Sequence, residues 1–243
     1  MSQLKHKLDG IYNTLMETYS DTPFMSALIS SSLATIGLAI NSTSTVIASA
    51  LISPIGTFII QANLLHFLKK YKYDFKGRKQ SPWYIPLLLV VITTLVISYL
   101  IGKAMIYFNN PFSGEPLNKD WPTHEMRLCS DPINAIYFIP IALLCGLILP
   151  LLIVNNNISG FVGIGIACSM IPPIANIGLS MNFKYNPVIH PPEMKDYKRR
   201  AVFSGFAIFI VNVILLLLPS RLLIDSILKK DNIFEKIESI FNF

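Results

Sequence analysis

Prolines and small polar residues recur at matching places in the two halves of this sequence. Residues 47–55 (IASALISPI) align with residues 166–174 (IACSMIPPI) at an offset of 119 positions. A proline within a helix removes one N–H donor and frees the carbonyl four residues earlier. In a bilayer, such broken backbone persists only where it is buried in protein or lines a wet cavity, so the freed groups can bind a solute.

The candidate site residues lie around these two breaks and in the last apolar segment. Ser49, Ser53 and Thr57 are spaced at i, i+4 and i+8, which places them along one face of a helix. Cys168 aligns with Ser49 in the repeat, and Asn176 lies one turn beyond Pro172. The predicted path residues are Ser49, Ser53, Pro54, Thr57, Cys168, Ser169, Pro172, Pro173, Asn176 and Asn212.

Each of these features also has a purely structural interpretation. The polar stripe through Ser53 faces either a pore or a partner helix, and the sequence favours neither. A lone Asn such as Asn212 in a membrane helix is more often a packing contact, worth about 0.6–2 kcal/mol through a hydrogen bond to a neighbouring helix. Pro54 alone predicts a kink, whereas its pairing with Pro172-Pro173 favours a break there. The Ser-rich residues 23–40 are expected to face protein or water rather than lipid.

The elements that carry these residues are predicted to be membrane helices. Charged residues make up 14% of the chain and hydrophobic residues 52%. Asp, Glu, Lys and Arg are missing from residues 22–68, 80–102, 132–183 and 201–220. Because one span needs about 20 apolar residues, these segments have room for about two, one, two and one spans. The composition therefore predicts an all-α integral membrane protein of about six transmembrane helices, and it excludes a soluble enzyme, a disulfide-stapled secreted domain and a disordered chain.

The predicted spans fall into two repeats of three. We divide the chain into an interfacial segment (1–21), repeat one with spans 1–3 (22–108), a polar loop (109–131), repeat two with spans 4–6 (132–223) and an amphipathic tail (224–243). Because each repeat has an odd number of spans, the two repeats must be inverted, with helices 2 and 5 broken by proline. Span five is predicted over residues 160–183 with Pro172-Pro173 near its middle, and it either crosses fully or re-enters.

The charged and ionisable residues indicate which kinds of binding partner and activity this protein has. The basic residues lie in short loops, which favours a bilayer with anionic headgroups over nucleic acid and predicts a cytosolic N-terminus. The helix faces made of small residues also suit contacts between copies of the chain, so a homo-oligomer is one of the alternatives. The predicted spans contain no Asp or Glu, which argues against a proton pump. Residues 124–131 match no metal motif and predict a solvated loop, and we expect no enzyme activity, cofactor or metal.

The chain resembles a known membrane family, the uncharacterised hydrophobic domain, which is the domain-of-unknown-function family numbered 389. The resemblance covers roughly residues 25–220 and rests on residues 36–54 with Asn41, on residues 163–179 with Pro172-Pro173, and on Asn212. The family usually has Gly-Ala-Met where this chain has Ala48-Ser49-Ala50, and many members carry a soluble domain ahead of the spans. The resemblance implies a multi-pass fold and no established activity.

Two functional hypotheses follow. The first is a transporter- or channel-like protein for a small solute or ion, with its path at the Pro54 and Pro172-Pro173 breaks. The second is a non-transporting membrane scaffold or assembly protein, because Ser- and Gly-rich faces suit oligomer contacts equally well. The first predicts that water reaches the breaks, whereas the second predicts a dry polar stripe whose substitution changes the oligomeric state.

Overall fold

The structure is a computed structural model that describes residues 23–70, 83–108, 114–154, 160, 163–164, 167–168 and 170–229. Within these residues all regular elements are helical, as the composition predicts. They are α2 (Pro23–Ala39), α3 (Thr43–Ile52), α4 (Ile55–Lys70), α5 (Tyr84–Met105), α6 (His124–Leu128), α7 (Pro132–Val154), α9 (Ile171–Ser180), the short 3-10 helix η1 (Pro192–Asp196) and α10 (Tyr197–Lys229). The predicted interfacial segment 1–21, Ser169 and the tail beyond residue 229 lie outside the described residues.

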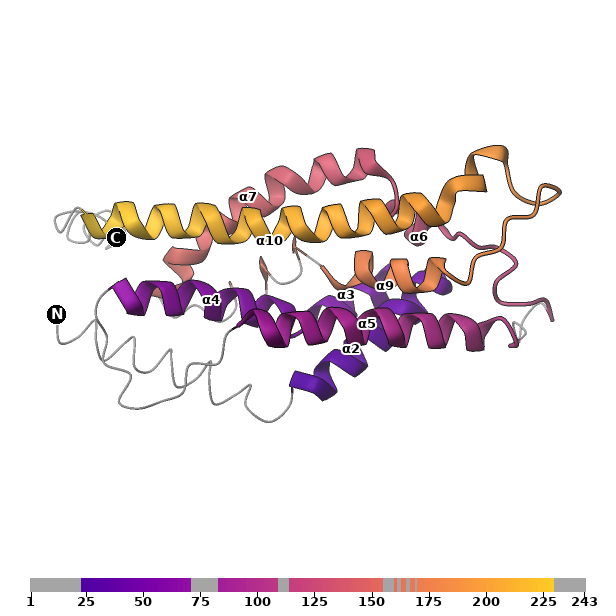
Figure 1. Cartoon of the computed structure of the whole chain (residues 1–243), viewed down its shortest axis with the longest axis horizontal. Helices are drawn as coiled ribbons and strands as arrows, with labels where there is room; N and C mark the ends of the chain where they lie inside the picture. Colours follow the sequence, from indigo (N-terminus) through magenta and orange to yellow (C-terminus); the bar gives the residue numbers. More distant parts are fainter. Residues whose placement is uncertain are drawn as a thin grey trace.

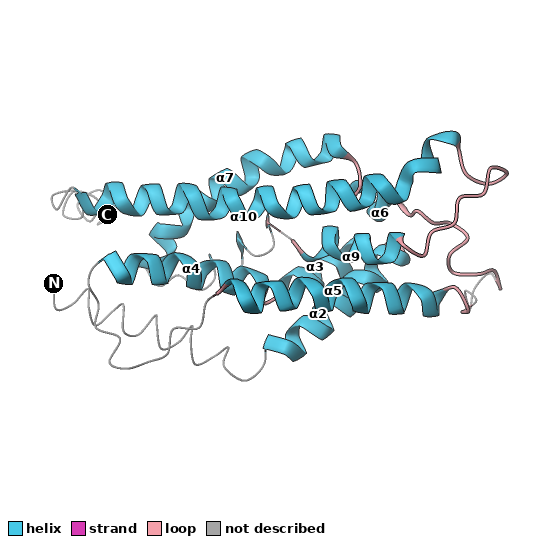
Figure 2. Ribbon diagram, in the orientation of Figure 1, coloured by secondary structure: helices cyan, strands magenta, loops and turns pink. Residues whose placement is uncertain are grey.

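The longer helices lie roughly along the long axis of the molecule (Figure 1). α4 and α10 both end at the left of Figure 1, whereas α5 and α9 end toward the right, where the loops before α6 and after α9 gather. Figure 2 shows these loops at that one end and helices over most of the remaining length. Helix α9 lies among four others, because it packs against α2, α3, α5 and α10.

The described helices differ in their ability to cross a membrane. Tyr84–Met105 and Pro192–Leu223 are long and apolar enough to do so by length and composition. Thr43–Ile52 and Ile55–Asn63 pass the same test together, with a bend of 41° between them, which gives up to three candidate spans among the described residues. The sequence predicts about six. Among the described residues, Phe24–Ala39 and Ile136–Leu152 are shorter apolar helices, and the ten residues of α9 rise only about 15 Å.

Both predicted proline breaks are present, but they differ in kind. α3 ends at Ile52, Ser53 is extended at φ −61° and ψ 128°, and α4 begins at Ile55, so Pro54 separates two helices. Pro172 and Pro173 instead lie in the first turn of α9. Proline is tolerated there because its missing N–H has no helical partner in the first turn. These two prolines therefore begin the short helix that follows the break, and the break itself lies just before them, at Met170.

Polar side chains of α2 face α5 rather than the outside. The hydroxyls of Ser31 and Thr94 are 2.8 Å apart, and those of Thr35 and Ser98, one turn further on, are 2.6 Å apart. All four side chains are fully buried. The expectation that the Ser-rich helix faces protein is confirmed for Ser31 and Thr35, because a hydroxyl with no water nearby needs a partner within the bundle.

Removing the Ser31–Thr94 pair gives a first prediction. In a double-mutant cycle of Ser31→Ala and Thr94→Ala, we expect a coupling energy of about 0.6 kcal/mol, the average for such bonds between membrane helices. Urea unfolding in detergent measures it. The cycle of Ser31→Ala with Ser98→Ala is the control, because the Ser31 hydroxyl is paired with Thr94 and the Ser98 hydroxyl with Thr35. Equal coupling in both cycles would contradict the assignment.

The outer faces of the long helices are apolar. Large apolar side chains are exposed along α5, α7 and α10: Leu88, Ile92, Val96 and Leu100; Ile136, Tyr137, Leu144 and Ile148; Phe203, Ile210, Ile214, Leu218 and Leu222. A soluble monomer rarely exposes so many large apolar side chains along the outer faces of its helices. Surfaces of this kind are compatible with contact with lipid chains, while the hydroxyl pairs point inward.

Candidate functional site

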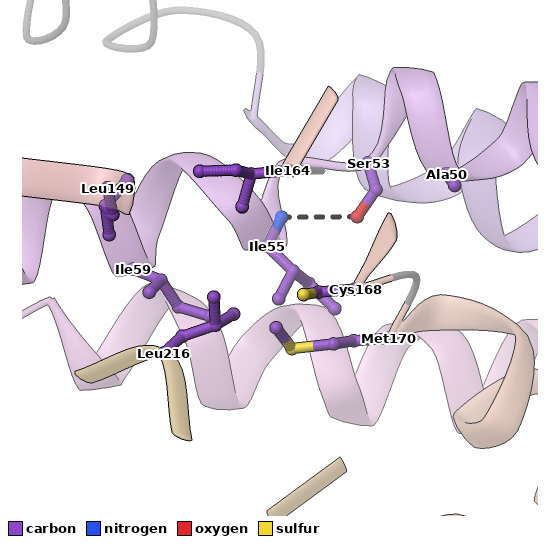
Figure 3. A pocket seen from close by; sticks show the side chains of 10 residues that line it. Ala50, Ser53, Ile55, Ile59, Leu149, Ile164, Cys168, Met170 and Leu216 are labelled. Carbon is purple, nitrogen blue, oxygen red and sulfur yellow. Dashed lines mark hydrogen bonds between the residues drawn. The ribbon is translucent and has the colours of Figure 1, made fainter. Parts of the chain in front are cut away.

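The two proline-associated segments meet at one cavity in the middle of the molecule (Figure 3). Ser53, Ile55 and Gly56 contribute from the first break, and Ile164, Cys168 and Met170 from the segment before α9. Ala50, Ile59, Leu149 and Leu216 complete the lining. Residues more than a hundred positions apart in the chain are thus brought together, as the matched motifs predict.

The cavity is small and mostly apolar. Its volume of about 20 Å³ has room for about one water molecule. Among the described lining residues, the Ser53 hydroxyl and the Cys168 thiol are the hydroxyl and thiol groups that face it. The Ser53 Oγ already accepts a hydrogen bond of 3.3 Å from the N–H of Ile55. In this conformation the cavity can hold one small polar molecule, but it provides no continuous passage.

The stripe predicted through Ser49, Ser53 and Thr57 is not one continuous helix face, which corrects the sequence interpretation. Ser49 and Thr57 lie on different helices, because α3 ends before Pro54 and α4 begins after it. The buried Ser49 hydroxyl donates to the carbonyl of Val46 at 2.6 Å. Thr57 is also buried. Neither side chain lines the cavity, so Ser53 is the member of this stripe that does.

Asn176 lies away from the cavity and is used to hold elements together. Its Nδ2 donates to the carbonyl of Met126 at 2.9 Å, and its Oδ1 accepts from the Tyr197 hydroxyl at 3.0 Å. Asn176 is fully buried on α9, and Tyr197 begins α10. Its amide therefore joins α6, α9 and α10. Of the residues around the second break, Cys168 lines the cavity, whereas Pro172 and Pro173 do not.

The segment around α6 is packed into the end of the bundle, which corrects the prediction of a solvated loop. The indole N–H of Trp121 donates to the carbonyl of Ala39 at 3.1 Å, and the Thr123 hydroxyl donates to that of Leu38 at 2.6 Å. Thr123 also caps α6 by accepting from the N–H of Met126. The fully buried Met126 explains the difference, because the apolar side chains here are buried against the α2–α3 turn.

Glu125 and Cys129 are two ionisable side chains of this segment. The Glu125 carboxylate accepts a hydrogen bond from the Thr43 hydroxyl, and its backbone N–H donates to the Asn41 Oδ1 at 3.0 Å. Burial raises the pKa of the Cys129 thiol to about 12, and the nearby Glu125 carboxylate adds to the rise. The thiol is therefore protonated at neutral pH and is a poor nucleophile. Among the described residues, no group of three His, Cys, Asp or Glu side chains could hold a metal ion.

Asn212 is the predicted residue with the most unusual surroundings. Its side chain is 1% exposed, and neither its Nδ2 nor its Oδ1 has a hydrogen-bond partner within the described part of the chain. The hydrogen bond to a neighbouring helix expected for a packing Asn is thus not among the described contacts. Asn63 on α4 is fully buried, and its Nδ2 and Oδ1 also have no hydrogen-bond partner among the described residues. The sequence offered one signal for Asn63, its alignment with Asn182 in the repeat.

These features define an all-helical protein with apolar helices of the kind found in membranes and a small central cavity between two helix breaks. The chain belongs to the family described as domain of unknown function (DUF389), whose model matches residues 74–218, more than half of its length. The second proline motif and Asn212 lie within the match, whereas the first motif lies before it. No curated protein and no solved structure matches the chain.

Proposed function

We propose that this protein is a six-span membrane protein that conducts a small solute through the centre of its bundle, where the two helix breaks meet. The observation that carries the proposal is the shared cavity, lined by Ser53 from one break and by Cys168 from the segment before the other. Broken helices at matching positions of two repeats are the usual place of the substrate site in transporters. The proposed orientation has a cytosolic N-terminus, from the distribution of basic residues.

The packing of the helices supports two inverted repeats. At an offset of 119 residues, α5 corresponds to part of α10, α2 to part of α7, and α9 to the start of α4. α2 packs against α5, and correspondingly α7 packs against α10. α9 packs against α5, and correspondingly α4 packs against α10. α4 and α9 also run toward opposite ends of the molecule, which is the relation that inversion requires (Figure 1).

Conduction requires the cavity to widen. A volume of about 20 Å³ admits a water molecule but no larger solute. The breaks are the places where such widening costs least, because Pro54 has already removed one helical hydrogen bond and Ser53 is already extended. We therefore assign the cavity to a closed conformation in which the break between α3 and α4 serves as the moving part.

Filling the cavity tests this proposal. In proteoliposomes, Ala50→Leu is expected to reduce solute flux about tenfold or more, because Ala50 lines the cavity and the added atoms exceed its free volume. Stopped-flow light scattering after an osmotic step with urea measures the flux. Ala48→Leu on the same helix is the matched control, since Ala48 does not line the cavity. Equal flux in the two variants, or no flux through the wild-type protein above that of empty vesicles, would count against the proposal.

A scaffold remains the second candidate, and one observation favours it. The amide of Asn176 and the hydroxyl of Ser49 are hydrogen-bonded within the protein, as a dry polar interior requires. A scaffold predicts that substitutions on the helix faces change the oligomeric state and leave membrane permeability unchanged. Size-exclusion chromatography with light scattering, run on the same variants, distinguishes the two candidates.

A further inference from the structure

Several buried polar side chains of α4 and α10 have no hydrogen-bond partner within the described residues. Besides Ser204 near the start of α10, they are Asn63, Asn212 and Ser220, and these three are each 0–1% exposed. Buried polar groups in proteins almost always have a partner, and those that do not usually contact water or a ligand. In a membrane bundle the expectation is stronger, because lipid offers nothing that could satisfy them.

These three residues lie one helical turn from the central cavity. Ile59 on α4 and Leu216 on α10 both line that cavity, so the two positions are level with each other. α4 and α10 pack together and run toward the same end of the molecule (Figure 1). Asn63 follows Ile59 by one turn, Ser220 follows Leu216 by one turn, and Asn212 precedes Leu216 by one turn. The two amides therefore flank the cavity, with Asn212 before it and Asn63 after it along the helices.

The other half of the molecule shows a different outcome at the corresponding position. Asn182 aligns with Asn63 at the repeat offset of 119 residues, and its Nδ2 donates to the carbonyl of Tyr99 on α5 at 3.0 Å. Gly102, one turn away on α5, leaves room for this amide, since a Cβ there would lie 2.7 Å from the Asn182 Nδ2. The amide of Asn182 is thus hydrogen-bonded in one half, whereas the corresponding amide of Asn63 has no partner among the described residues.

We propose that Asn63, Asn212 and Ser220 bind the conducted solute, and that this solute is uncharged and both donates and accepts hydrogen bonds. This inference rests on the proposed function and names the residues and the substrate class of its path. A carboxamide offers an acceptor oxygen and a donor NH₂ side by side, and a hydroxyl offers both functions in one atom. The apolar part of the interface, residues 55–68 of α4 and 201–220 of α10, carries no Asp, Glu, Lys or Arg, so an ion would find no opposite charge there. Water is the smallest solute of this class, and urea is the next one we test.

Solvent access to the two amides is the direct test. In a background without Cys129, Cys145 and Cys168, Asn63→Cys and Asn212→Cys are placed singly in proteoliposomes and exposed to a membrane-impermeant methanethiosulfonate. We expect both to react about tenfold or more faster than Ser31→Cys, which replaces an equally buried side chain whose hydroxyl is already paired with Thr94. Lys119→Cys in the exposed loop serves as the positive control for labelling.

Flux of the apolar variants separates binding from packing. Asn63→Leu and Asn212→Leu are expected to lower urea flux about tenfold while the melting temperature is kept or raised, because removing an unpaired buried amide relieves a desolvation penalty. One outcome overturns the assignment of these residues but leaves the proposed path intact. In it, the wild-type protein conducts urea, but Asn63→Cys and Asn212→Cys are labelled no faster than Ser31→Cys. Labelling at both positions without flux in the wild-type protein supports a hydrated binding site and overturns conduction instead. A loss of melting temperature in both leucine variants also overturns the assignment, because it identifies the amides as packing contacts.

Discussion

The substitution Gly146→Val is expected to prevent the bundle from assembling, because α7 crosses α10 at this residue with almost no space between the backbones. A Cβ at Gly146 would lie 2.2 Å from the carbonyl oxygen of Leu215 and 3.2 Å from the Cα of Leu216. Both are backbone atoms of α10, so no side chain can rotate away to relieve the contact. The two helices would have to separate, and we expect a loss of about 3 kcal/mol or more in the free energy of unfolding.

Gly163→Val is the matched control for this prediction. A Cβ at Gly163 would have no heavy atom within 4 Å among the described residues, so the same change should leave the fold intact. Fluorescence-detected size-exclusion chromatography and a thermal melt in detergent compare the two variants. A Gly146→Val protein that elutes and melts like the Gly163→Val protein would contradict the close crossing of α7 and α10.

The second large effect is expected for Asn176→Leu. Asn176 donates to the carbonyl of Met126 and accepts from the hydroxyl of Tyr197, and all three groups are buried. The substitution removes both hydrogen bonds of the amide, and the Tyr197 hydroxyl keeps a longer bond of 3.3 Å to the Met126 carbonyl. Since each unsatisfied buried group costs about 1–3 kcal/mol, we expect a loss of about 2–4 kcal/mol.

The comparison with Asn212→Leu makes this prediction specific. Both residues are buried asparagines in apolar helices, and the same substitution removes the same amide. Only the Asn176 amide is hydrogen-bonded within the described residues, so only Asn176→Leu should lower the melting temperature. Similar losses in the two variants would show that Asn212 also holds the fold together. If the Asn176→Leu protein is as stable as the wild type, this amide does not hold α6, α9 and α10 together.

Local properties of the chain explain which predictions succeeded. The helical class follows from composition, and the end of α3 before Pro54 follows from the missing N–H of proline. The inward orientation of Ser31 and Thr35 follows from the cost of exposing hydroxyls to lipid. The matched motifs also indicated that the two breaks belong together, and Ser53 and Cys168 do line one cavity. Each of these inferences needs only the residue and its immediate surroundings along the chain.

Predictions that depended on distant neighbours were less successful. Asn176 follows the break by one turn, as a path residue would, yet it is bonded to Met126, which is 50 positions away. Residues 124–131 are predicted to form a solvated loop, yet Met126 is fully buried, and the preceding Trp121 and Thr123 bond to carbonyls at the end of α2. The stripe through Ser49 and Thr57 assumed one straight helix, which the break at Pro54 divides. In each case the partner that decides the outcome is far away in the sequence.

The sequence by itself determined the helical class, the apolar segments and the positions of the two breaks, because these depend on the hydropathy of short segments and on the covalent structure of proline. Only the tertiary structure decided which polar groups are satisfied. Asn176, Asn182 and Asn212 are the same residue type in similar apolar surroundings, yet the first two find partners at Met126 and Tyr99, whereas the third has none among the described residues. The reason is geometric, because a hydrogen bond forms only where packing places a donor about 3 Å from an acceptor.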